Sequence, residues 1–526
     1  MAHPHDPAVD GRGFTTLSVA SILSESAVRH ADRPAVFYND EAITYRELWD
    51  QSRAYSGALR ARGIGRGDRV AMMIPNVPDF PRVYYAVLAL GAIVVPIHLL
   101  LKAEEITRTL QDAGADLFIA SATSLAEAAP AAAEAGVPFM TVLLPADAPG
   151  AIPRLEAEAA AAEPITRIEP TGPLDAATIL FTSGTTGTPK GAVGSHLSII
   201  EQVHSGLIDG VQVSNQDVTF GGLPLFHTFG QTSVLNMAFR AGSAVILMPR
   251  FDGDQALELM VKHQATVFVG VPTMYVGLLE AARRSDARPP LKFANSGGAA
   301  LPVALLEAFE EAYGVPPHEG YGLTETAPTV TVNRFGEPTV PGTVGQTLWG
   351  VEVALADPDI EDRIEFFEGE GDLGEVIVRG HNVFKGYVGR EEATQEAIVD
   401  GWFRTGDLGT YADGILTIVD RKKDMILRSG YNVYPTEVEA VLARHPKVAA
   451  SAVFGVDDEL RGQEIHVAVL PLAGTEIDPA EIIEFAKEHV AAYKYPRVVH
   501  IVDDLPLGAS GKILKRELQR IYSPAK

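Results

Sequence analysis

The segment Thr182–Gly191, TSGTTGTPKG, combines glycine, hydroxyl and lysine side chains and contains no aliphatic one. Its glycines can adopt positive φ and let a bulky group approach the backbone. Successive backbone N–H groups in such a turn form a concave anion site, to which hydroxyl groups and Lys190 add donors and positive charge. These residue types predict a phosphate cradle, although a flexible surface linker has a similar composition.

The spacing differs from the nucleotide-binding loop in which Gly-Lys is followed by Ser or Thr. Here Lys190 follows Pro189 and precedes Gly191. The segment GASGKI at 508–513 fails the same test, because Ile513 follows Lys512. We therefore expect a phosphate site of another kind at 182–190.

A strand and a larger sheet must position this loop. TILF (178–181) is typical of a strand and leads directly into the glycines. Helix and strand signals alternate in 43–74, 101–120 and 251–271. Such alternation predicts βαβ units around a parallel sheet, and hence an α/β fold class.

The pattern changes near residue 374, where GEVIVRG, GWFRTGD and GILTIVDRKKDMIL read as short strands joined by Gly/Asp turns. Helices and strands alternate again after residue 434. We place a domain boundary near 420, which divides the chain into a large domain (1–420) and a small α+β domain (421–526) of ordinary size.

The composition limits the partners. The 526 residues include 43 basic and 68 acidic side chains, a formal net charge of −25. Such a charge repels nucleic acid and anionic membranes, so we expect neither. The absence of cysteine excludes disulfides, thiolate zinc sites, iron–sulfur clusters and a cysteine nucleophile. The N-terminus does not resemble a secretory signal, and the longest apolar run, near 88–101, is too short for a transmembrane segment, so we expect a cytoplasmic protein.

The glycine-rich loop resembles the signature loop of the adenylate-forming superfamily, which includes acyl-CoA synthetases, peptide-synthetase adenylation domains and luciferases. Further motifs of that family follow in order along nearly the whole chain: LPLFHTFG (223–230), NSGGAAL (295–301), YGLTET (321–326), GEVIVRG (374–380), GWFRTGDLG (401–409), DRKKDMILRSGYNVYP (420–435) and ASGKILKREL (509–518). Several motifs in register are far more specific than one. The resemblance is greatest to the acyl-CoA synthetase and fatty-acid–CoA ligase branch.

The resemblance implies a large domain of βαβ subdomains with a small β-barrel-like subdomain, hinged to a small mobile α+β domain. It also implies a two-step reaction. A carboxylate attacks the α-phosphate of ATP to give acyl-AMP and pyrophosphate, and a thiol then takes the acyl group. The first step joins two anions, so catalysis there is positioning and charge neutralisation.

The resemblance assigns the ATP phosphates to the glycine-rich loop. The β- and γ-phosphates would contact Thr182, Ser183, Gly184, Thr185, Thr186, Gly187 and Lys190. Thr324 would donate to the α-phosphate. Glu325, with Thr182 as a helper, would hold Mg²⁺, a hard cation that prefers oxygen ligands and substrate phosphates. Without the resemblance, Glu325 reads as a solvated acid that caps a helix.

The nucleoside contacts come from three other motifs. Tyr321 and Gly322 would lie at the adenine, and Gly297, Gly298 and Ala299 would let the backbone approach the edge of the base. Asp407 would accept hydrogen bonds from the ribose hydroxyl groups, with Arg421 also at the ribose. Taken alone, Asp407 between Gly406 and Gly409 is also typical of a turn.

Lys512 is the principal catalytic candidate, since the family uses the equivalent lysine to bridge the carboxylate and the α-phosphate. The residues before it, PLGA at 506–509, depart from the family pattern but leave the SGK core intact. Lys423 occupies the hinge position, about which the small domain would rotate between the half-reactions. A thiol-side loop that includes Arg428, Ser429 and Gly430 would then face the incoming thiol.

His227 resembles the gate between the acyl pocket and the thiol tunnel, although a His in an apolar segment is often structural. Thr228 stands where peptide-synthetase domains place an aspartate for the α-ammonium group, so an α-amino acid is disfavoured. The apolar and neutral residues of 230–239 and 327–333 favour a fatty, aryl or short unsaturated acid, and they do not indicate the length of the acyl chain. Arg334 is a candidate partner for a second carboxylate.

The thiol acceptor stays open between coenzyme A, the commoner choice, and the phosphopantetheine arm of an acyl carrier protein. A luciferase-like oxygenase and a non-catalytic nucleotide-binding relative are further alternatives. Nothing in the sequence supports the oxygenase. A non-catalytic relative would be expected to lack Lys512, Glu325 or Asp407, and the sequence contains all three. A homodimer is a tendency of the family only.

Overall fold

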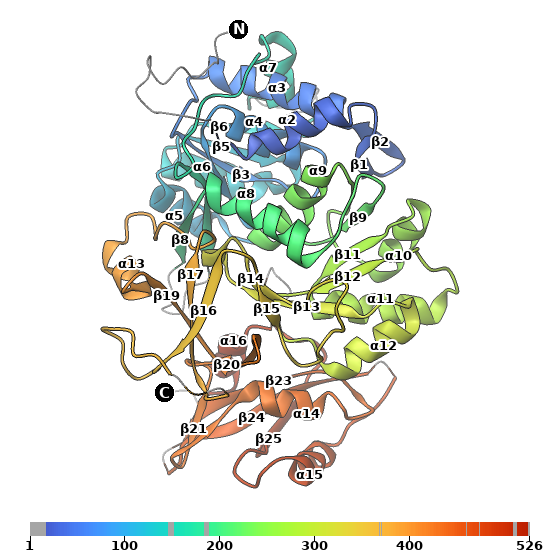
Figure 1. Ribbon diagram of the computed structural model, residues 1–526, viewed down its shortest axis with the longest axis vertical. Coiled ribbons are helices and arrows are strands. Elements are labelled where there is room, and N and C mark those ends of the chain that lie inside the picture. The colour runs from blue at the N-terminus through green and yellow to red at the C-terminus, as the bar shows by residue number, and fades with distance from the viewer. Residues whose placement is uncertain are drawn as a thin grey trace.

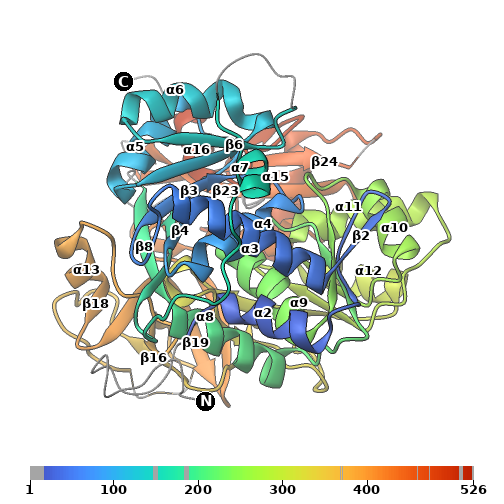
Figure 2. The same cartoon turned by 90° about the horizontal axis from the view of Figure 1, so that it is seen from above.

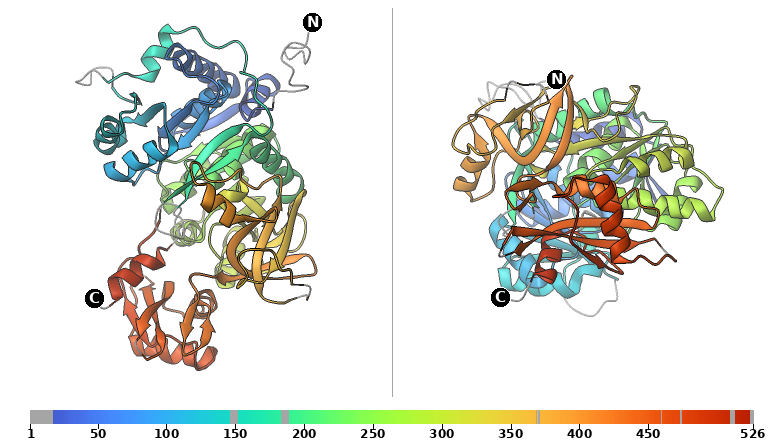
Figure 3. Two further views of the ribbon diagram at one scale, coloured as in Figure 1. Left: turned by 90° about the vertical axis from the view of Figure 1, so that its left-hand side faces the viewer. Right: turned by 90° about the horizontal axis from the view of Figure 1, so that it is seen from below.

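The structure is a computed structural model that describes residues 17–145, 152–182, 189–367, 369, 371–458, 460–472, 474–508 and 513–523. Figure 1 shows two large sheets with their helices above a small C-terminal sheet. The view in Figure 3 separates this C-terminal part most clearly from the rest of the molecule. The candidate residues Ser183, Gly184, Thr185, Thr186, Gly187 and Lys512 lie outside the described residues.

The largest sheet has 14 strands and two halves of different character. In the first half, β1 and β9 to β13 run parallel, and β2 pairs antiparallel at the edge. These strands are β2 (Glu41–Thr44), β1 (Pro34–Tyr38), β10 (Ala244–Leu247), β9 (Val218–Gly221), β11 (Val267–Gly270), β12 (Phe293–Ser296) and β13 (Pro317–Gly322). They are short, mostly buried runs, as expected for a parallel sheet covered on both faces.

The second half of this sheet is antiparallel and begins where β14 pairs with β13. Its strands are β14 (Thr329–Val332), β15 (Gly345–Thr347), β20 (Ile415–Arg421), β19 (Trp402–Ala412), β17 (Gly374–Gly380), β16 (Val351–Ala356) and the short β18 (Ile398–Val399) beside β19. The expected change to short strands therefore comes at β14, earlier than residue 374. The 374–380 and 401–412 motifs form the neighbouring strands β17 and β19.

The second large sheet has six strands and carries the glycine-rich segment at its edge. Its order is β6 (Phe139–Val142), β5 (Leu117–Ser121), β3 (Arg69–Met73), β4 (Ile93–Pro96), β7 (Ala176–Thr182) and β8 (Lys190–Ser195). All but β8 run parallel. The apolar run near 88–101 contains the buried strand β4.

Helices fill the space between the two large sheets. Helix α3 (Tyr45–Ala61) contacts β1 of one sheet, and α4 (Asp79–Ala89) contacts β4 of the other, while α3 and α4 pack on each other. Figure 2 shows these two helices near the middle of the large domain, next to α2 (Ala20–Arg29) and α9 (Met237–Ala241). Outer helices are α5 (Ala103–Ala113), α6 (Leu125–Ala135), α10 (Gly253–Lys262), α11 (Pro272–Arg284) and α12 (Val303–Tyr313).

The C-terminal sheet has five strands: β22 (Tyr431–Val433), β21 (Ile426–Arg428), β24 (Gly462–Pro471), β23 (Val448–Asp458) and β25 (Val498–Ile501). Helices α14 (Pro435–Leu442) and α15 (Pro479–His489) supply apolar side chains to one core on this sheet, and α16 (Lys515–Tyr522) supplies them to a second core. The large sheet ends with β20 at Arg421, and this sheet begins at Ile426. The domain boundary near 420 stays a prediction that this change of sheet supports.

Among the described residues, none of the helices combines the length and the apolar character needed to cross a membrane.

Candidate active site

One cavity of about 2290 Å³ receives residues from both large sheets and from the C-terminal part of the chain. Its walls include the carboxyl ends of the parallel strands β12 and β13, where ligands of open α/β sheets commonly bind. The sequence-predicted residues that line it are Thr182, Lys190, His227, Gly297, Gly298, Ala299, Tyr321, Gly322, Thr324, Glu325, Asp407, Arg421 and Lys423. The structure therefore brings together motifs that are far apart in the sequence.

The β7–β8 hairpin positions the two described ends of the glycine-rich loop. Thr182 is the last residue of β7, Lys190 is the first of β8, and the two are register partners. The Lys190 Nζ lies 5.2 Å from the ring centroid of Tyr387, which gives the ammonium group an aromatic face to rest on. The loop that would hold phosphates thus begins and ends at the cavity wall.

Glu325 lies in a short 3₁₀ turn, Thr324–Thr326, which follows β13 almost directly. Its side chain is only 8% exposed, and its Oε1 accepts a hydrogen bond of 2.8 Å from the Tyr387 hydroxyl. Burial raises the pKa of Glu325, and the hydrogen bond from Tyr387 partly offsets this rise. A buried carboxyl with a raised pKa is well placed to gain from a bound cation.

Gly322 shows why the chain can turn so tightly before Glu325. A Cβ at Gly322 would stand 1.7 Å from the carbonyl oxygen of Pro328, so only glycine fits there. The close approach folds the 323–328 segment back on the end of β13. This turn carries Thr324 and Glu325 to the cavity.

Asp407 is the centre of a second polar group. Its Oδ2 accepts a hydrogen bond of 2.6 Å from the Tyr321 hydroxyl, and its Oδ1 lies 3.2 Å from the Arg421 Nε. Asp407 and Arg421 face each other as register partners on β19 and β20, and Asp407 is 4% exposed. Burial and the Asp407 charge both raise the pKa of Tyr321, so this hydroxyl stays protonated and donates.

A buried ion pair fixes the irregular part of strand β19 that presents Asp407. The Arg404 Nε donates to the Glu375 Oε2 at 3.0 Å, and both side chains are almost fully buried. The other Glu375 oxygen accepts from the Gly406 backbone N–H at 3.0 Å. Gly406 has a φ of 71°, a conformation that favours glycine.

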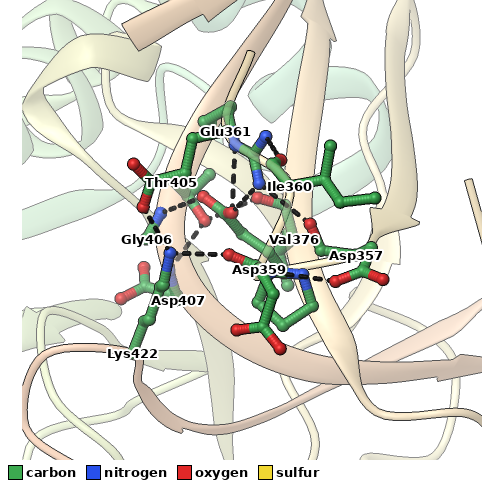
Figure 4. A network of polar contacts seen from close by, with 12 residues as sticks. Asp357, Asp359, Ile360, Glu361, Val376, Thr405, Gly406, Asp407 and Lys422 are labelled. Carbon is green, nitrogen blue, oxygen red and sulfur yellow. Dashed lines mark hydrogen bonds and ion pairs between the residues drawn. The ribbon is translucent and has the colours of Figure 1, made fainter. Parts of the chain in front are cut away.

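Further hydrogen bonds complete this network, which Figure 4 shows around Thr405, Gly406 and Asp407. The Thr405 hydroxyl donates to the carbonyl oxygen of Val376 at 2.6 Å and accepts from the Asp407 N–H at 3.1 Å. The Lys422 N–H donates to the Gly406 carbonyl at 2.9 Å, and its Nζ contacts Glu361 at 2.7 Å. Asp407 is therefore held by backbone contacts on both sides.

The 297–299 segment forms the opposite wall. Gly298 has a φ of 84°, and a Cβ at Gly297 would come within 3.0 Å of the Phe229 ring. Two residues beyond this segment, the Leu301 N–H donates to the Glu319 carboxyl at 3.0 Å. Burial raises the pKa of Glu319 to about 8, so this group is largely a neutral acid that anchors the end of the loop.

His227 also lines the cavity. Its Nδ1 accepts from the Phe229 N–H at 3.4 Å, and its carbonyl accepts from Gln231 at the start of the helical segment η3 (Gly230–Asn236). Thr228 is buried and also lines the cavity. These positions are compatible with the predicted gate.

Six uncharged residues from η2 (Gly206–Gly210), η3, α8 (His196–Ser205), α9 and β14 also line the cavity: Gln202, Gly206, Gly210, Thr232, Met237 and Val332. A Cβ at Gly206 would meet Met237 at 3.0 Å, and a Cβ at Gly210 would meet Val332 at 3.6 Å. Ser195 caps α8 directly after β8, which fixes the direction of this wall. We call these six residues the neutral end.

Arg334 does not belong to this cavity. It is absent from the lining, and its Nη2 donates to the carbonyl oxygen of Thr347 at 3.1 Å. The suggestion that Arg334 binds a second carboxylate of the substrate therefore has no geometric support.

The C-terminal candidates divide into two groups. Lys423 lines the cavity, and burial lowers its pKa, as do Arg421 and Arg516. Arg428, Ser429 and Gly430 are not among the lining residues. Arg428 instead forms a bidentate ion pair with Glu464, at 2.6 and 3.1 Å.

Three further contributors were not identified from the sequence. Tyr387 links Lys190 to Glu325, the Arg404–Glu375 pair holds the part of β19 that presents Asp407, and Gln202 pairs through its amide with the backbone of Thr329, at 2.9 and 3.1 Å. Arg404 and Glu375 lie inside quoted motifs, but their spacing of 29 residues gives no sign of the contact. Tyr387 and Gln202 carry no local signal at all.

Family models match most of the chain. Residues 23–388 match the model described as AMP-binding enzyme, and residues 437–512 match the AMP-binding enzyme C-terminal domain. Among curated proteins, the chain is 33% identical to a long-chain-fatty-acid–CoA ligase of Bacillus subtilis, with 95% of this chain and 94% of that protein covered. It is 35% identical to a feruloyl-CoA synthase of an Amycolatopsis species, with 93% and 96% covered.

Among solved structures, the fold is similar to ATP-bound MatB from Rhodopseudomonas palustris, with a TM-score of 0.88 and 31% identity over 97% of this chain and 99% of that one. Apo MatB gives a TM-score of 0.76 over the same shares. The arrangement of this chain is therefore closer to the ATP-bound form.

The Arg404–Glu375 pair gives a test of how Asp407 is held. The change Glu375→Gln leaves the Arg404 guanidinium buried without its negative partner, which we expect to lower the free energy of unfolding by about 3–5 kcal/mol. Glu352→Gln is the matched control, because its pair with Arg379 is about half exposed and should be worth at most about 1 kcal/mol. Denaturant unfolding measures both, and equal losses would contradict the role of the buried pair.

Proposed function

We propose how this chain, which belongs to the family of AMP-binding enzymes and is an AMP-forming acyl-CoA synthetase, divides its reaction among the residues of the cavity. One observation carries the proposal. The ends of the glycine-rich loop, Glu325 and the Asp407–Arg421 pair line one cavity, where the Tyr387 hydroxyl donates to Glu325 and the Tyr321 hydroxyl donates to Asp407.

The reaction is ATP-dependent acid–CoA ligation. A carboxylate oxygen attacks the α-phosphorus of ATP, the bond to the β-phosphate oxygen breaks, and pyrophosphate leaves. The sulfur of CoA then attacks the acyl carbonyl of acyl-AMP, AMP leaves, and the thiol proton is lost. The compared relatives are CoA ligases and give no support to a carrier-protein acceptor.

We assign the β- and γ-phosphates to the 182–190 loop, with Lys190 as its described positive charge, and the α-phosphate to Thr324. Glu325 and the Thr182 hydroxyl fit a magnesium ion, because both offer hard oxygen donors at the cavity. Among the described residues, no group of three His, Asp or Glu side chains could hold a metal alone. Magnesium, which neutralises phosphate charge, would thus be held by Glu325 together with the nucleotide.

We assign the ribose to Asp407 and Arg421, and the adenine to Tyr321, Gly322 and the 297–299 segment. Each oxygen of the Asp407 carboxylate has a partner: the Arg421 guanidinium lies beside one, and the Tyr321 hydroxyl donates to the other. Both contacts orient the carboxylate before the nucleotide arrives. Preorganisation of this kind lowers the entropy lost on binding.

We assign to Lys512 the positive charge that serves acyl-AMP formation and is withdrawn before thiol transfer. It is carried by a C-terminal domain that rotates about Lys423. Gly508 and Ile513, on either side of the Lys512 segment, both line the cavity. Arg428, Ser429 and Gly430 lie outside it, as a pose for acyl-AMP formation requires. The higher similarity to ATP-bound than to apo MatB supports this pose.

We propose that the acid is a small monocarboxylic acid of aryl or alkyl type, which binds at the neutral end. The amide of Gln202 there is already paired with the Thr329 backbone. Thr228 offers no charge for an α-ammonium group. ATP and CoA are cytoplasmic co-substrates, which agrees with the expected location.

The role of Lys512 predicts a split between the half-reactions. Lys512→Ala should slow acyl-AMP formation by at least about 100-fold, which is the effect of losing one preorganised donor. ATP–pyrophosphate exchange measures this step. Transfer to CoA from supplied acyl-AMP should survive much better, which serves as the internal control. Equal losses in both steps would contradict the two-pose model.

Tyr387→Phe predicts a change in pH dependence. The hydroxyl lowers the pKa of Glu325, so its loss raises that pKa further. Glu325 must be ionised to hold a cation, so the exchange rate falls as the pH drops through the pKa of Glu325. In the variant, this fall should begin at a higher pH. Tyr313→Phe is the control, since the Tyr313 hydroxyl bonds to Leu278 away from the cavity. An unchanged acidic limb would count against the contact.

The neutral end predicts the substrate preference. Alkyl and aryl monocarboxylic acids should exceed dicarboxylic acids of equal length by at least about 100-fold in kcat/KM, because a second carboxylate would be buried without a partner. The exchange assay with matched pairs of acids measures this preference, and the mass of the CoA product identifies the acid that is transferred. A preference for the dicarboxylic member would overturn the assignment.

A further inference from the structure

A lysine close to the Lys512 segment is held by an acid of its own domain. Lys515 is the first residue of α16, and its Nζ lies 2.8 Å from the Glu439 Oε1. The same Glu439 oxygen accepts from the Val453 N–H at 2.7 Å, which fixes the carboxylate. Lys515 is only 20% exposed, so its ammonium group has a defined position rather than a free surface one.

A second acid, which belongs to the large domain, acts on this lysine through its charge. Asp420 is the second-to-last residue of strand β20 in the 14-stranded sheet and is 5% exposed. Its Oδ2 accepts a hydrogen bond of 2.9 Å from the Thr436 N–H in the first turn of α14. Asp420 therefore caps the helix that presents Glu439 one turn later, and this brings two carboxylates to one buried junction.

The charges at this junction depend on one another. Burial raises the pKa of Asp420, whereas Lys515 lowers it. Burial alone would lower the pKa of Lys515, but Glu439 and Asp420 raise it overall, with a smaller effect from Asp424. Without the lysine, Asp420 and Glu439 would repel each other across a poorly hydrated contact.

The two acids lie on opposite sides of the hinge residue Lys423. Glu439 and Lys515 belong to the same C-terminal domain, so their ion pair moves with that domain. Asp420 precedes the hinge and stays with the large sheet. The attraction between Lys515 and Asp420 is therefore specific to the present arrangement, in which Gly508 and Ile513 line the cavity.

We propose that Lys515 is a positioning residue: its ammonium group, held by Glu439, attracts the Asp420 carboxylate across the hinge and favours the arrangement in which the Lys512 segment serves acyl-AMP formation. The proposal rests on the two-pose function proposed above. It adds a residue that sets the equilibrium between the poses rather than touching the substrate. Such a bias changes a rate only through the population of the competent pose.

Lys515→Ala removes this bias. We expect acyl-AMP formation in single turnover to slow by about 10-fold, and transfer from supplied acyl-AMP to CoA to stay constant or rise, as a population shift requires. Lys515→Arg keeps the charge and should restore most of the rate. Lys447→Ala is the matched control, because its 2.9 Å pair with Glu481 lies wholly within the C-terminal domain, and it should change neither step.

Asp420→Asn tests the junction from the other side. An asparagine oxygen can still accept from Thr436, so this variant removes the charge and keeps the helix contact. We expect it to slow acyl-AMP formation in the same direction as Lys515→Ala, and the double variant to be less than additive. If Lys515→Ala fails to fold, the Asp420→Asn rates decide.

Several results would overturn the proposal. These are equal slowing of both half-reactions in Lys515→Ala, full acyl-AMP formation in Asp420→Asn, or additive effects in the double variant. The two-pose function itself is judged separately, by Lys512→Ala. If that variant loses only acyl-AMP formation while Lys515→Ala and Asp420→Asn retain it, the function stands and the positioning role of Lys515 fails.

Discussion

Repulsion between like charges is the constraint on which this structure depends. Acyl-AMP formation brings a carboxylate against a polyphosphate, and it does so on a protein with a formal net charge of −25. Bulk electrostatics oppose both ligands, so the attraction must come from local groups. The structure gathers Lys190, Arg421 and Lys423 at one cavity, where Glu325 and Asp407 each accept a hydrogen bond from a tyrosine hydroxyl.

The supports of the cavity use buried polar contacts rather than loops alone. Arg404 and Glu375 cross from β19 to β17 and fix the irregular part of β19 before Asp407. The neutral acid Glu319 holds the end of the 297–301 segment. Such pairs cost desolvation free energy, but they give each functional carboxylate a single orientation. The extensive buried apolar core around the surrounding sheets offsets this desolvation free energy.

The sequence predicted the elements and the residue types better than the contacts. The strand at 178–181, the α/β alternation and the family motifs are local patterns, and the structure places their residues at one cavity. Tyr387 could not be foreseen, because its contacts to Lys190 and Glu325 depend on how β8 meets the 383–390 segment. The suggested role of Arg334 has no geometric support because sequence gives no direction for a side chain. The antiparallel strands begin at β14, since a tight turn at Gly322 reverses the chain there.

The position of Tyr387 has a consequence for how ligands enter. Its ring supports the lysine of the phosphate hairpin, and its hydroxyl supports the carboxyl that suits a divalent ion. A displacement of either partner is thus transmitted to the other through one rigid aromatic group. Under the proposed assignment of the triphosphate to this hairpin and of the cation to Glu325, the two binding energies are linked, and such linkage is reciprocal: each occupant changes the affinity for the other by the same factor.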